Sequence, residues 1–498
     1  ALLTEGGTFT YRQLDEESDA LAAFFVSSGL KPGDVICISG EKHLRSLACL
    51  IGALKAGITY SMFDPESPLA RLEKIFERCK PAMILCAENI ARQLTRHGYK
   101  AFDFQKLTLS DLRAENAELV CRLLPSITAN TPAYIMFTSG STGFPKGAVM
   151  THQNVLNLIE WSLQTYQFEK QDVLTSVNPF FFDNSVFDIY SSLFSGASLA
   201  LFDGQTVRDP AKLLRLIDQY KCTSWFSVPS MLIYLQTVRA LRKESFSHLK
   251  RIIFGGEGYP KAKLKQLFDL FADRLTLYNV YGPTECTCIC SSYRVSADDF
   301  ADLKGFLPLG SLAPNFSGLI VDEDLRTVAE GEVGELVLRG ANVGLGYYRD
   351  AERTEAVFIQ NPTNTEYREI VYRTGDLVYV DKVDGKIWIV GRADNQIKHM
   401  GYRIELEEIE NALTCCALVE QSAVIHCEIR GLSQIVAFIR ARDSKPDEEA
   451  LRKDLSALIP QYMIPTRFEF RSQLPRNANG KLDRKQLKSE YVEQLVNG

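Results

Sequence analysis

The sequence predicts an α/β protein with a large N-terminal domain, residues 1–393, and a smaller C-terminal α+β domain, residues 394–498. Three observations predict it. Apolar runs of strand length alternate with helical patterns up to about residue 300, which is typical of mostly parallel sheets covered by helices. Short strands and glycine turns follow from about residue 305, which indicates a small β-barrel. A new alternation of helices and strands begins after residue 393.

The first part of the chain repeats helix and strand at a regular spacing. Helical patterns span 9–26, 43–57, 68–79, 186–194 and 210–219. Apolar runs of strand length span 35–38, 60–63, 82–86, 173–177, 197–202, 223–228 and 250–254. A further helix is expected after Thr151, a good capping residue. Its apolar face includes Val155, Leu156, Ile159 and Leu163.

The rest of the chain has a different pattern. Strands at 318–321 and 334–338 with glycine turns predict a small antiparallel barrel or sheet. The C-terminal domain combines two helical patterns with two strands. Its helices are expected at 405–414 and 447–459, and its strands near 421–428 and 434–440.

Composition and charge argue against two classes of partner. At 498 residues the chain is too long for one core, and the usual domain size suggests about three units. The net charge of −6 comes without a basic block, so nucleic acid is not an expected partner. The longest apolar runs are too short to span a bilayer, and no secretory signal opens the sequence. Ala1 in place of Met suggests a trimmed or partial sequence.

The twelve cysteines predict free thiols. They are too sparse for a disulfide scaffold and lack paired CxxC motifs at zinc spacing, and reduced thiols fit a cytoplasmic protein. Cys286, Cys288 and Cys290 alternate at the period of a strand. A buried strand of small apolar side chains is the favoured interpretation, and a metal site is the alternative.

A glycine-rich loop, TSGSTGFPKG at 138–147, lies between apolar runs that predict strands. Glycines let successive N–H groups converge on an anion, and a lysine adds a point charge suited to a leaving pyrophosphate. The loop predicts a polyphosphate site, with a flexible polar loop as the alternative. It differs from the usual P-loop because Gly147 follows Lys146 where Ser or Thr offers a hydroxyl to Mg²⁺. The candidate residues are Thr138, Ser139, Gly140, Ser141, Thr142, Gly143 and Lys146.

Two later clusters carry groups suited to a nucleotide. NVYGPTE at 279–285 combines an aromatic ring, a tight turn and a carboxylate. An aromatic face can stack on a base, and a glutamate near phosphates can hold Mg²⁺. YRTGDL at 372–377 places Asp376 on a turn, where its oxygens could accept from ribose hydroxyls. Ordinary turns are the alternatives for both, and a plain surface lysine is the alternative for Lys481, which follows the Asn479-Gly480 turn.

Together these segments resemble the adenylate-forming superfamily, in particular amino-acid adenylation domains of nonribosomal peptide synthetases. Within it, SVFDIYSSLFSG, WFSVPS and IIFGGEGYP look most like the D-alanine–carrier protein ligases. The match covers nearly the whole chain in the family's order. Its motifs are LKAGITY (54–60), AYIMFTSGSTGFPKG (133–147), FDNS (182–185), NVYGPTE, GELVLRG (334–340), YRTGDL, GRADNQIKHMGYRIELEEIE (391–410), LIPQYMIP (458–465) and NGKLDR (479–484).

The resemblance implies that ATP lies over the 138–146 loop and reacts with an amino-acid carboxylate to give an aminoacyl adenylate. Tyr281 would stack on adenine, and Glu285 would hold Mg²⁺. Lys481 would bridge carboxylate and phosphate oxygens, where charge develops in the transition state. The implied nucleotide-binding residues beyond the loop are Asn279, Tyr281, Gly282, Thr284, Asp376, Arg392 and Lys481, with Asp376 and Arg392 on the ribose. The implied catalytic residues are Lys481, Thr284, near the α-phosphate, and Lys146.

A second half-reaction is implied as well. The C-terminal domain would turn about Asp394, and the loop from Lys398 to Arg403 would replace Lys481. The phosphopantetheine thiol of a carrier protein would then attack the adenylate. No carrier segment follows residue 498, so we expect either an enzyme that acts on a separate carrier or a domain of a longer synthetase.

Asp183 in FDNS indicates the substrate class. In amino-acid-activating members the matching aspartate pairs with the substrate ammonium. Acyl- and aryl-acid relatives lack it, because an unpaired buried carboxylate facing an apolar acid is costly. The alternative is that Asp183 only caps the 186–194 helix. The implied pocket residues are Asn184, Phe187, Ser227, Ile253, Gly255, Val280, Cys288 and Ile289.

This pocket departs from that of the D-alanine ligases. They carry a cysteine at the position of Gly255 and aliphatic residues at those of Asn184 and Phe187. We expect Gly255 to enlarge the pocket, and Asn184 to add a hydrogen-bonding group that an apolar ligand would leave unpaired. D-alanine and a larger or polar small amino acid, such as Ser, Thr or Val, therefore both stay open.

Two other functions stay open. One is an acyl- or aryl-CoA ligase with the same first step. The other is a non-catalytic binding module with the same fold, against which the presence of Lys146, Glu285, Asp376 and Lys481 argues.

Overall fold

The computed structural model describes residues 1–107, 118, 120–122, 124–429, 432–442, 446–476 and 482–497. The chain divides into two compact units. The first unit comprises Ala1–Pro65, Cys79–Phe137 and Gly147–Ala393. The second comprises Glu66–Arg78, Thr138–Lys146 and Asp394–Gly498, so the glycine-rich loop groups with the C-terminal part of the chain.

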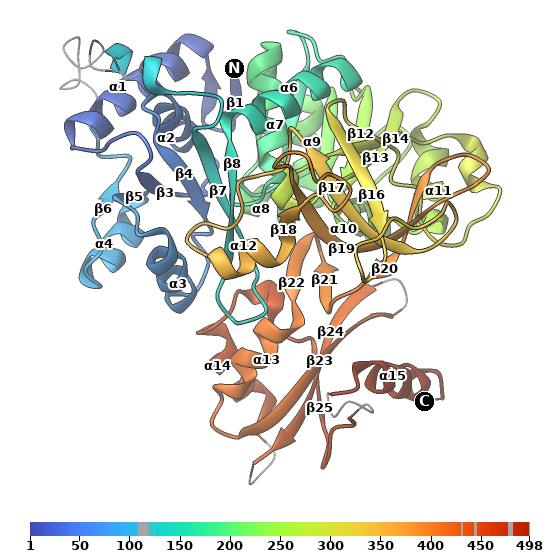
Figure 1. Cartoon of the computed structure of the whole chain (residues 1–498). Coiled ribbons are helices and arrows are strands. Elements are labelled where there is room, and N and C mark those ends of the chain that lie inside the picture. Colours follow the sequence, from blue (N-terminus) through green and yellow to red (C-terminus); the bar gives the residue numbers. More distant parts are fainter. Residues whose placement is uncertain are drawn as a thin grey trace. The chain divides into compact units, whose positions relative to one another are not determined.

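A six-stranded sheet lies in the N-terminal part of the chain, with β3, β4 and β5 side by side in blue in Figure 1. Its order is β6-β5-β3-β4-β7-β8, and its pairs from β6 to β7 are parallel. Every residue of β3, β4 and β5 is buried, as expected for a sheet covered on both faces. The strands are β3 (Val35–Ser39), β4 (Thr59–Phe63), β5 (Met83–Cys86), β6 (Ala101–Asp103), β7 (Pro132–Thr138) and β8 (Lys146–Thr151).

A nine-stranded sheet of order β15-β14-β13-β12-β11-β9-β10-β1-β2 follows. Its strands from β13 to β1 are parallel, and the strands at its two edges pair antiparallel. The two helix-covered, mostly parallel sheets of the prediction are therefore confirmed. The strands are β1 (Leu2–Thr4), β2 (Gly7–Phe9), β9 (Val173–Ser176), β10 (Ser198–Leu201), β11 (Ser224–Ser227), β12 (Arg251–Gly255), β13 (Thr276–Tyr281), β14 (Ser291–Arg294) and β15 (Ser311–Leu312).

Helices cover these sheets and close two apolar cores. One core joins residues of both sheets, such as Ile38 and Ile253. The other lies around Trp225 and Ile252 of the nine-stranded sheet. No helix among the described residues is long and apolar enough to cross a membrane. The helices of the first unit are α1 (Tyr11–Ser27), α2 (Leu44–Lys55), α4 (Glu88–Arg96), α6 (His152–Tyr166), α7 (Asn184–Ser195), α8 (Gly204–Arg208), α9 (Pro210–Gln219), α10 (Pro229–Thr237), α11 (Lys261–Phe271) and α12 (Ala351–Val357), with short 3-10 turns η2 (Leu124–Ser126), η3 (Thr284–Cys286) and η4 (Ala297–Phe300).

A five-stranded antiparallel sheet completes the first unit and confirms the expected barrel or sheet. The expected turn around Asp376 is wrong, because Asp376 lies inside a long strand. Gly375 has a φ of +71°, and the strand's pairing shifts there, as in a β-bulge. The strands are β16 (Phe316–Val321), β17 (Gly334–Gly340), β18 (Phe358–Gln360), β19 (Ile370–Val380) and β20 (Ile387–Arg392).

The second unit is α+β, as expected. A hairpin precedes a three-stranded sheet that helices cover on both faces: α13 and α14 on one and α15 on the other (Figure 1). The hairpin strands are β21 (Gln396–His399) and β22 (Tyr402–Glu405), and the sheet strands are β23 (Val419–Ile429), β24 (Leu432–Ala441) and β25 (Arg467–Phe470). The helical elements are α3 (Leu69–Cys79), α13 (Leu406–Thr414), α14 (Glu448–Ser456), η5 (Gln461–Met463) and α15 (Arg484–Asn497).

Two local predictions are wrong. Cys286, Cys288 and Cys290 are buried, but they do not form a strand, because Thr287 and Cys288 have φ values of +63° and +71°. Thr151 caps α6 as predicted, through a reciprocal capping box. Leu156, however, is 51% exposed instead of lying on the buried face.

Two histidines of the second unit share one serine hydroxyl. His399 Nδ1 lies 2.6 Å and His426 Nε2 2.7 Å from Ser433 Oγ. Burial, followed by the nearby His399 and Lys488, lowers the pKa of His426 to about 4, and burial also lowers the pKa of His399. The hairpin is therefore joined to the three-stranded sheet through His399, whose hydrogen-bond partner Ser433 also contacts His426 within the sheet.

We expect this arrangement to make the second unit sensitive to acid. An unfolded histidine binds a proton near pH 6.5, whereas folded His426 stays neutral to about pH 4. The free energy of unfolding should therefore fall as pH drops from 6.5 to 4, by at most about 3 kcal/mol from His426. Chemical unfolding of wild type and His426→Gln across this range measures the effect. His248→Gln, at an exposed position, serves as control and should keep the wild-type slope.

Candidate active site

Most of the predicted substrate residues gather at one edge of the nine-stranded sheet. Strands β9, β11, β12 and β13 are adjacent and parallel, so their carboxyl ends lie together. Asp183 and Asn184 follow β9, Ser227 ends β11, Gly255 ends β12, and Val280 lies at the end of β13. The carboxyl edge of such a sheet is where α/β proteins bind their ligands.

Asp183 lies at the N-terminus of α7 without capping it. It occupies the N-cap position, yet its side chain makes no capping hydrogen bond. Its carboxylate faces two buried groups. Burial and then Asp183 raise the pKa of the Tyr134 hydroxyl, and the same two causes raise the pKa of the Cys288 thiol. The alternative role expected for Asp183, as a helix cap, is thus not seen.

The wall behind Asp183 is aromatic and aliphatic. Phe187 is 1% exposed and packs edge-on against the ring of Phe226, with ring centroids 5.0 Å apart. Ile253, Val280 and Cys288 belong to the same core, as does Ile289. Asn184 adds a polar side chain to this wall. Its Oδ1 accepts a hydrogen bond from Cys288 Sγ at 3.8 Å.

Two predicted pocket features differ in the structure. Ser227 lies on the opposite face of the sheet from Phe226, where its hydroxyl accepts from Trp225 Nε1 at 2.8 Å and donates to the Val228 carbonyl. Gly255 does not open extra space, because a Cβ there would lie 2.3 Å from Val280 O. The volume that the glycine leaves is occupied by the neighbouring strand. The expected enlargement of the pocket at Gly255 is therefore wrong.

Three of the predicted nucleoside residues of the first unit, Tyr281, Asp376 and Arg392, form one hydrogen-bonded chain. Arg392 Nη1 lies 2.5 Å from Asp376 Oδ1, and the Tyr281 hydroxyl donates to Asp376 Oδ2 at 2.6 Å. The bulge at Gly375 directs Asp376 between them. Burial and then the Asp376 carboxylate raise the pKa of Tyr281, so the phenol stays protonated and donates. Asn279 Nδ2 donates to the Pro308 carbonyl at 2.9 Å.

Glu285 is fully buried beside Thr284. The Tyr347 hydroxyl donates to Glu285 Oε1 at 2.6 Å. A glycine is required at Gly282, because a Cβ there would lie 2.3 Å from Cys288 O. Among the described residues no group of three His, Cys, Asp or Glu could hold a metal alone.

Tyr347 is expected to hold the Glu285 carboxylate in place. In Tyr347→Phe the buried Glu285 carboxylate loses the hydrogen bond that the Tyr347 hydroxyl donates, so the free energy of unfolding should fall by about 1–3 kcal/mol. The Mg²⁺ concentration for half-maximal ATP turnover should also rise. Tyr348→Phe is the matched control, since Tyr348 is adjacent and its ring lies beside the Arg349 guanidinium. Unfolding titrations and a Mg²⁺ titration measure the two effects, and equal values for the two variants would contradict this role.

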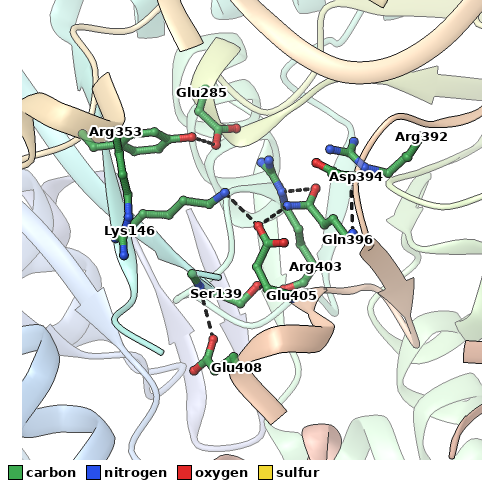
Figure 2. A network of polar contacts seen from close by, with 12 residues as sticks. Ser139, Lys146, Glu285, Arg353, Arg392, Asp394, Gln396, Arg403, Glu405 and Glu408 are labelled. Carbon is green, nitrogen blue, oxygen red and sulfur yellow. Dashed lines mark hydrogen bonds and ion pairs between the residues drawn. The ribbon is translucent and has the colours of Figure 1, made fainter. Parts of the chain in front are cut away.

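In the second unit, the glycine-rich loop is contacted by Arg403 and by two carboxylates that the sequence did not single out (Figure 2). Lys146 Nζ lies 3.0 Å from Glu405 Oε1, and Gly140 N donates to Glu408 Oε2 at 3.2 Å. Ser139 Oγ donates to the Arg403 carbonyl at 2.7 Å. Ser141 and Thr142 are exposed, Gly143 has a φ of +78° and Thr138 Oγ1 is buried with no hydrogen-bond partner among the described residues. These donors have the chemistry of an anion site.

Three residues near the candidate sites carried no signal in the sequence. Tyr134 lies in an apolar run that predicts only a strand, yet its buried hydroxyl is near Asp183 and has no hydrogen-bond partner among the residues described. Tyr347 follows a glycine-rich segment and Glu405 lies in the 391–410 motif, but neither segment indicates which group the side chain contacts. Asp394, the expected hinge, accepts from Gln396 N at 3.2 Å. Lys481, the expected catalytic lysine, lies outside the described residues.

Comparison with known families accounts for both units. Residues 1–348 match the AMP-binding enzyme family, and residues 408–481 match the AMP-binding enzyme C-terminal domain. The chain belongs to the AMP-binding enzymes. It is an AMP-forming ligase, which confirms the superfamily expected from the motifs.

Similar AMP-binding enzymes include carrier protein ligases and peptide synthetases. The D-alanine–D-alanyl carrier protein ligase of Listeria monocytogenes is 32% identical over 494 residues, which cover 97% of this chain and 94% of that protein. A dimodular nonribosomal peptide synthase of Bacillus subtilis is 32% identical over 496 residues. That alignment covers 98% of this chain and 20% of the synthase, so the chain spans about a fifth of that relative's length.

Solved structures share the fold. Holo-PA1221, a nonribosomal peptide synthetase protein with adenylation and PCP domains, has a TM-score of 0.83 at 25% identity, covering 98% of this chain and 81% of that chain. The o-succinylbenzoate CoA synthetase of Bacillus subtilis has a TM-score of 0.85 at 21% identity, covering 98% and 95%. Since both kinds of ligase have this fold, the substrate must be inferred from the site.

Proposed function

We propose that this AMP-binding enzyme activates a small amino acid with ATP and transfers it to the phosphopantetheine thiol of a carrier protein. The amino-acid carboxylate attacks the α-phosphorus, pyrophosphate leaves, and an aminoacyl adenylate forms. The thiolate then attacks the acyl carbon, and AMP leaves. The similarity to a D-alanine–D-alanyl carrier protein ligase over nearly its full length supports the carrier as acceptor.

The position of Asp183 carries the proposal. It is a carboxylate at the ligand-binding edge of the sheet that does not serve the helix it begins. A substrate ammonium is a suitable ion-pair partner for such a carboxylate, whereas an apolar acid offers it no opposite charge. The pocket behind it is filled by Phe187 and by Val280 beside Gly255, so the substrate side chain is small. Asn184 favours a side chain that can hydrogen-bond, such as that of serine or threonine.

We propose the nucleotide-binding roles residue by residue. Tyr281, Asp376 and Arg392 would hold the nucleoside, and the 138–146 loop would hold the polyphosphate. Glu285 would hold Mg²⁺, which supplies positive charge to the phosphates when bound. Lys481 would stabilise the negative charge that develops as the carboxylate attacks, with Thr284 and Lys146 assisting. All twelve cysteines are thiols outside any disulfide, which accords with a cytoplasmic location.

An acyl- or aryl-CoA ligase is the competing proposal. The two proposals differ in the acid that is activated and in the thiol that accepts the acyl group. The enzyme is incubated with ATP, Mg²⁺, small amino acids and a phosphopantetheinylated carrier protein, and in parallel with fatty or benzoic acids and coenzyme A. We expect AMP formation and an aminoacyl mass increase on the carrier in the first mixture only. An acyl-CoA product in the second mixture, with an unmodified carrier in the first, would contradict the proposal.

A further inference from the structure

Two carboxylates of the second unit occupy the anion donors of the glycine-rich loop. Glu405 pairs with Lys146, and Glu408 accepts from the Gly140 amide. Only 13% of the Lys146 side chain and 8% of the Glu405 side chain are exposed, so this ion pair is largely shielded from water. A lysine and a glycine amide are the groups of this loop best suited to phosphate oxygens.

The Ser139 hydroxyl is occupied by the same segment. It donates to the Arg403 carbonyl and accepts from the Glu405 amide at 3.0 Å. Asn411 Nδ2, one helical turn beyond Glu408, donates to the Ser141 carbonyl at 3.2 Å. The segment from Arg403 to Asn411 therefore contacts three kinds of group on the loop: backbone groups, the Ser139 hydroxyl and the Lys146 ammonium.

Both carboxylates are themselves held in position. Gln396 Nε2 donates to Glu405 Oε1 at 2.6 Å, and Arg403 Nε holds the Gln396 amide oxygen at 2.6 Å (Figure 2). Arg71 forms a buried ion pair with Glu408. These partners hold Glu405 and Glu408 in fixed positions. They also offset the cost of burying the two carboxylates.

We propose that Glu405 and Glu408 are internal anions that compete with the polyphosphate of ATP for the loop. A donor that binds a carboxylate is not available to a phosphate oxygen. The carboxylate and the phosphate also repel each other, because both are negatively charged. The loop thus binds either the second unit's carboxylates or a polyphosphate. Its apparent affinity for polyphosphate is lowered in proportion to the fraction of molecules in which the carboxylates occupy it. The inference rests on the proposed function only in taking ATP as the source of the polyphosphate.

Binding of inorganic tripolyphosphate and pyrophosphate to the full chain tests the competition without any catalytic step. Isothermal titration compares wild type with Glu405→Gln, which keeps the shape and removes the charge. We expect Glu405→Gln to bind both probes about tenfold more tightly. Glu408→Gln should act in the same direction, and thermal unfolding checks that loss of its Arg71 pair leaves the protein folded.

Glu407→Gln is the matched control, because it makes the same charge change on the same helix turn. Glu407 pairs with Arg484 at 3.3 Å instead of the loop, so its affinity for the probes should remain that of wild type. In a Lys146→Met background, Glu405→Gln should have no further effect, since the ammonium group that Glu405 occupies is gone. Equal affinities for Glu405→Gln and Glu407→Gln would overturn the inference. Absence of polyphosphate binding in wild type and all variants would overturn the proposed use of ATP as well.

Discussion

Asp183→Ala should abolish amino-acid-dependent ATP–pyrophosphate exchange. If the carboxylate binds the substrate ammonium, its removal leaves a charged group without a partner in a largely apolar pocket, and such losses cost about 2–5 kcal/mol. We expect kcat/KM for the amino acid to fall at least about 100-fold, with binding of ATP unchanged. Asp183→Asn should show a similar loss, because it keeps the shape and removes the charge. Exchange assays at varied amino-acid concentration measure the effect.

Asp203→Ala is the control that separates substrate binding from helix capping. Asp203 caps α8 by accepting from Thr206 N at 2.7 Å, so its loss should lower stability by about 1 kcal/mol. Exchange by the folded protein should be unaffected. If Asp183→Ala behaves in the same way, with lowered stability and unchanged exchange, the ammonium pairing is wrong.

Lys481→Ala should lose adenylation by about three orders of magnitude while it still binds ATP. The ammonium is expected to act where charge develops in the transition state, and a group of that kind contributes more to the rate than to ground-state binding. Exchange rates and equilibrium binding of ATP measure the two quantities. Lys485→Ala, an exposed lysine on α15, tests the alternative of a plain surface lysine. Equal exchange rates for the two variants would refute the role of Lys481.

Local pattern carried most of the fold prediction. Alternation of apolar runs and helical faces is set by neighbouring residues, so the strands from β3 to β5 and from β9 to β12 follow from the sequence. The failures have non-local causes. Asp376 lies in a strand because β19 pairs with β17 on one side and with β20 on the other, where Asp376 lies opposite Arg392. Cys288 leaves strand geometry where its carbonyl approaches Gly282.

Candidate site residues could be predicted from the sequence where a short motif contains the chemical groups of the site. Asp183 and the 138–147 loop are of this kind. The contacts that support them join distant positions: Tyr347 reaches Glu285 across 62 residues, and Glu405 reaches Lys146 across 259. No periodicity or composition encodes such pairs. The role of Gly255 failed for the same reason, because the space beside it is decided by Val280 on the next strand.

The central claim is that a small amino acid is the acid which this enzyme activates. Pyrophosphate exchange with each of the twenty amino acids and their D-forms, beside fatty and benzoic acids, tests it most directly. We predict exchange with one or a few small amino acids, and none with the free fatty or benzoic acids. Exchange that depends on a fatty or benzoic acid, with all amino acids inactive, would contradict the claim.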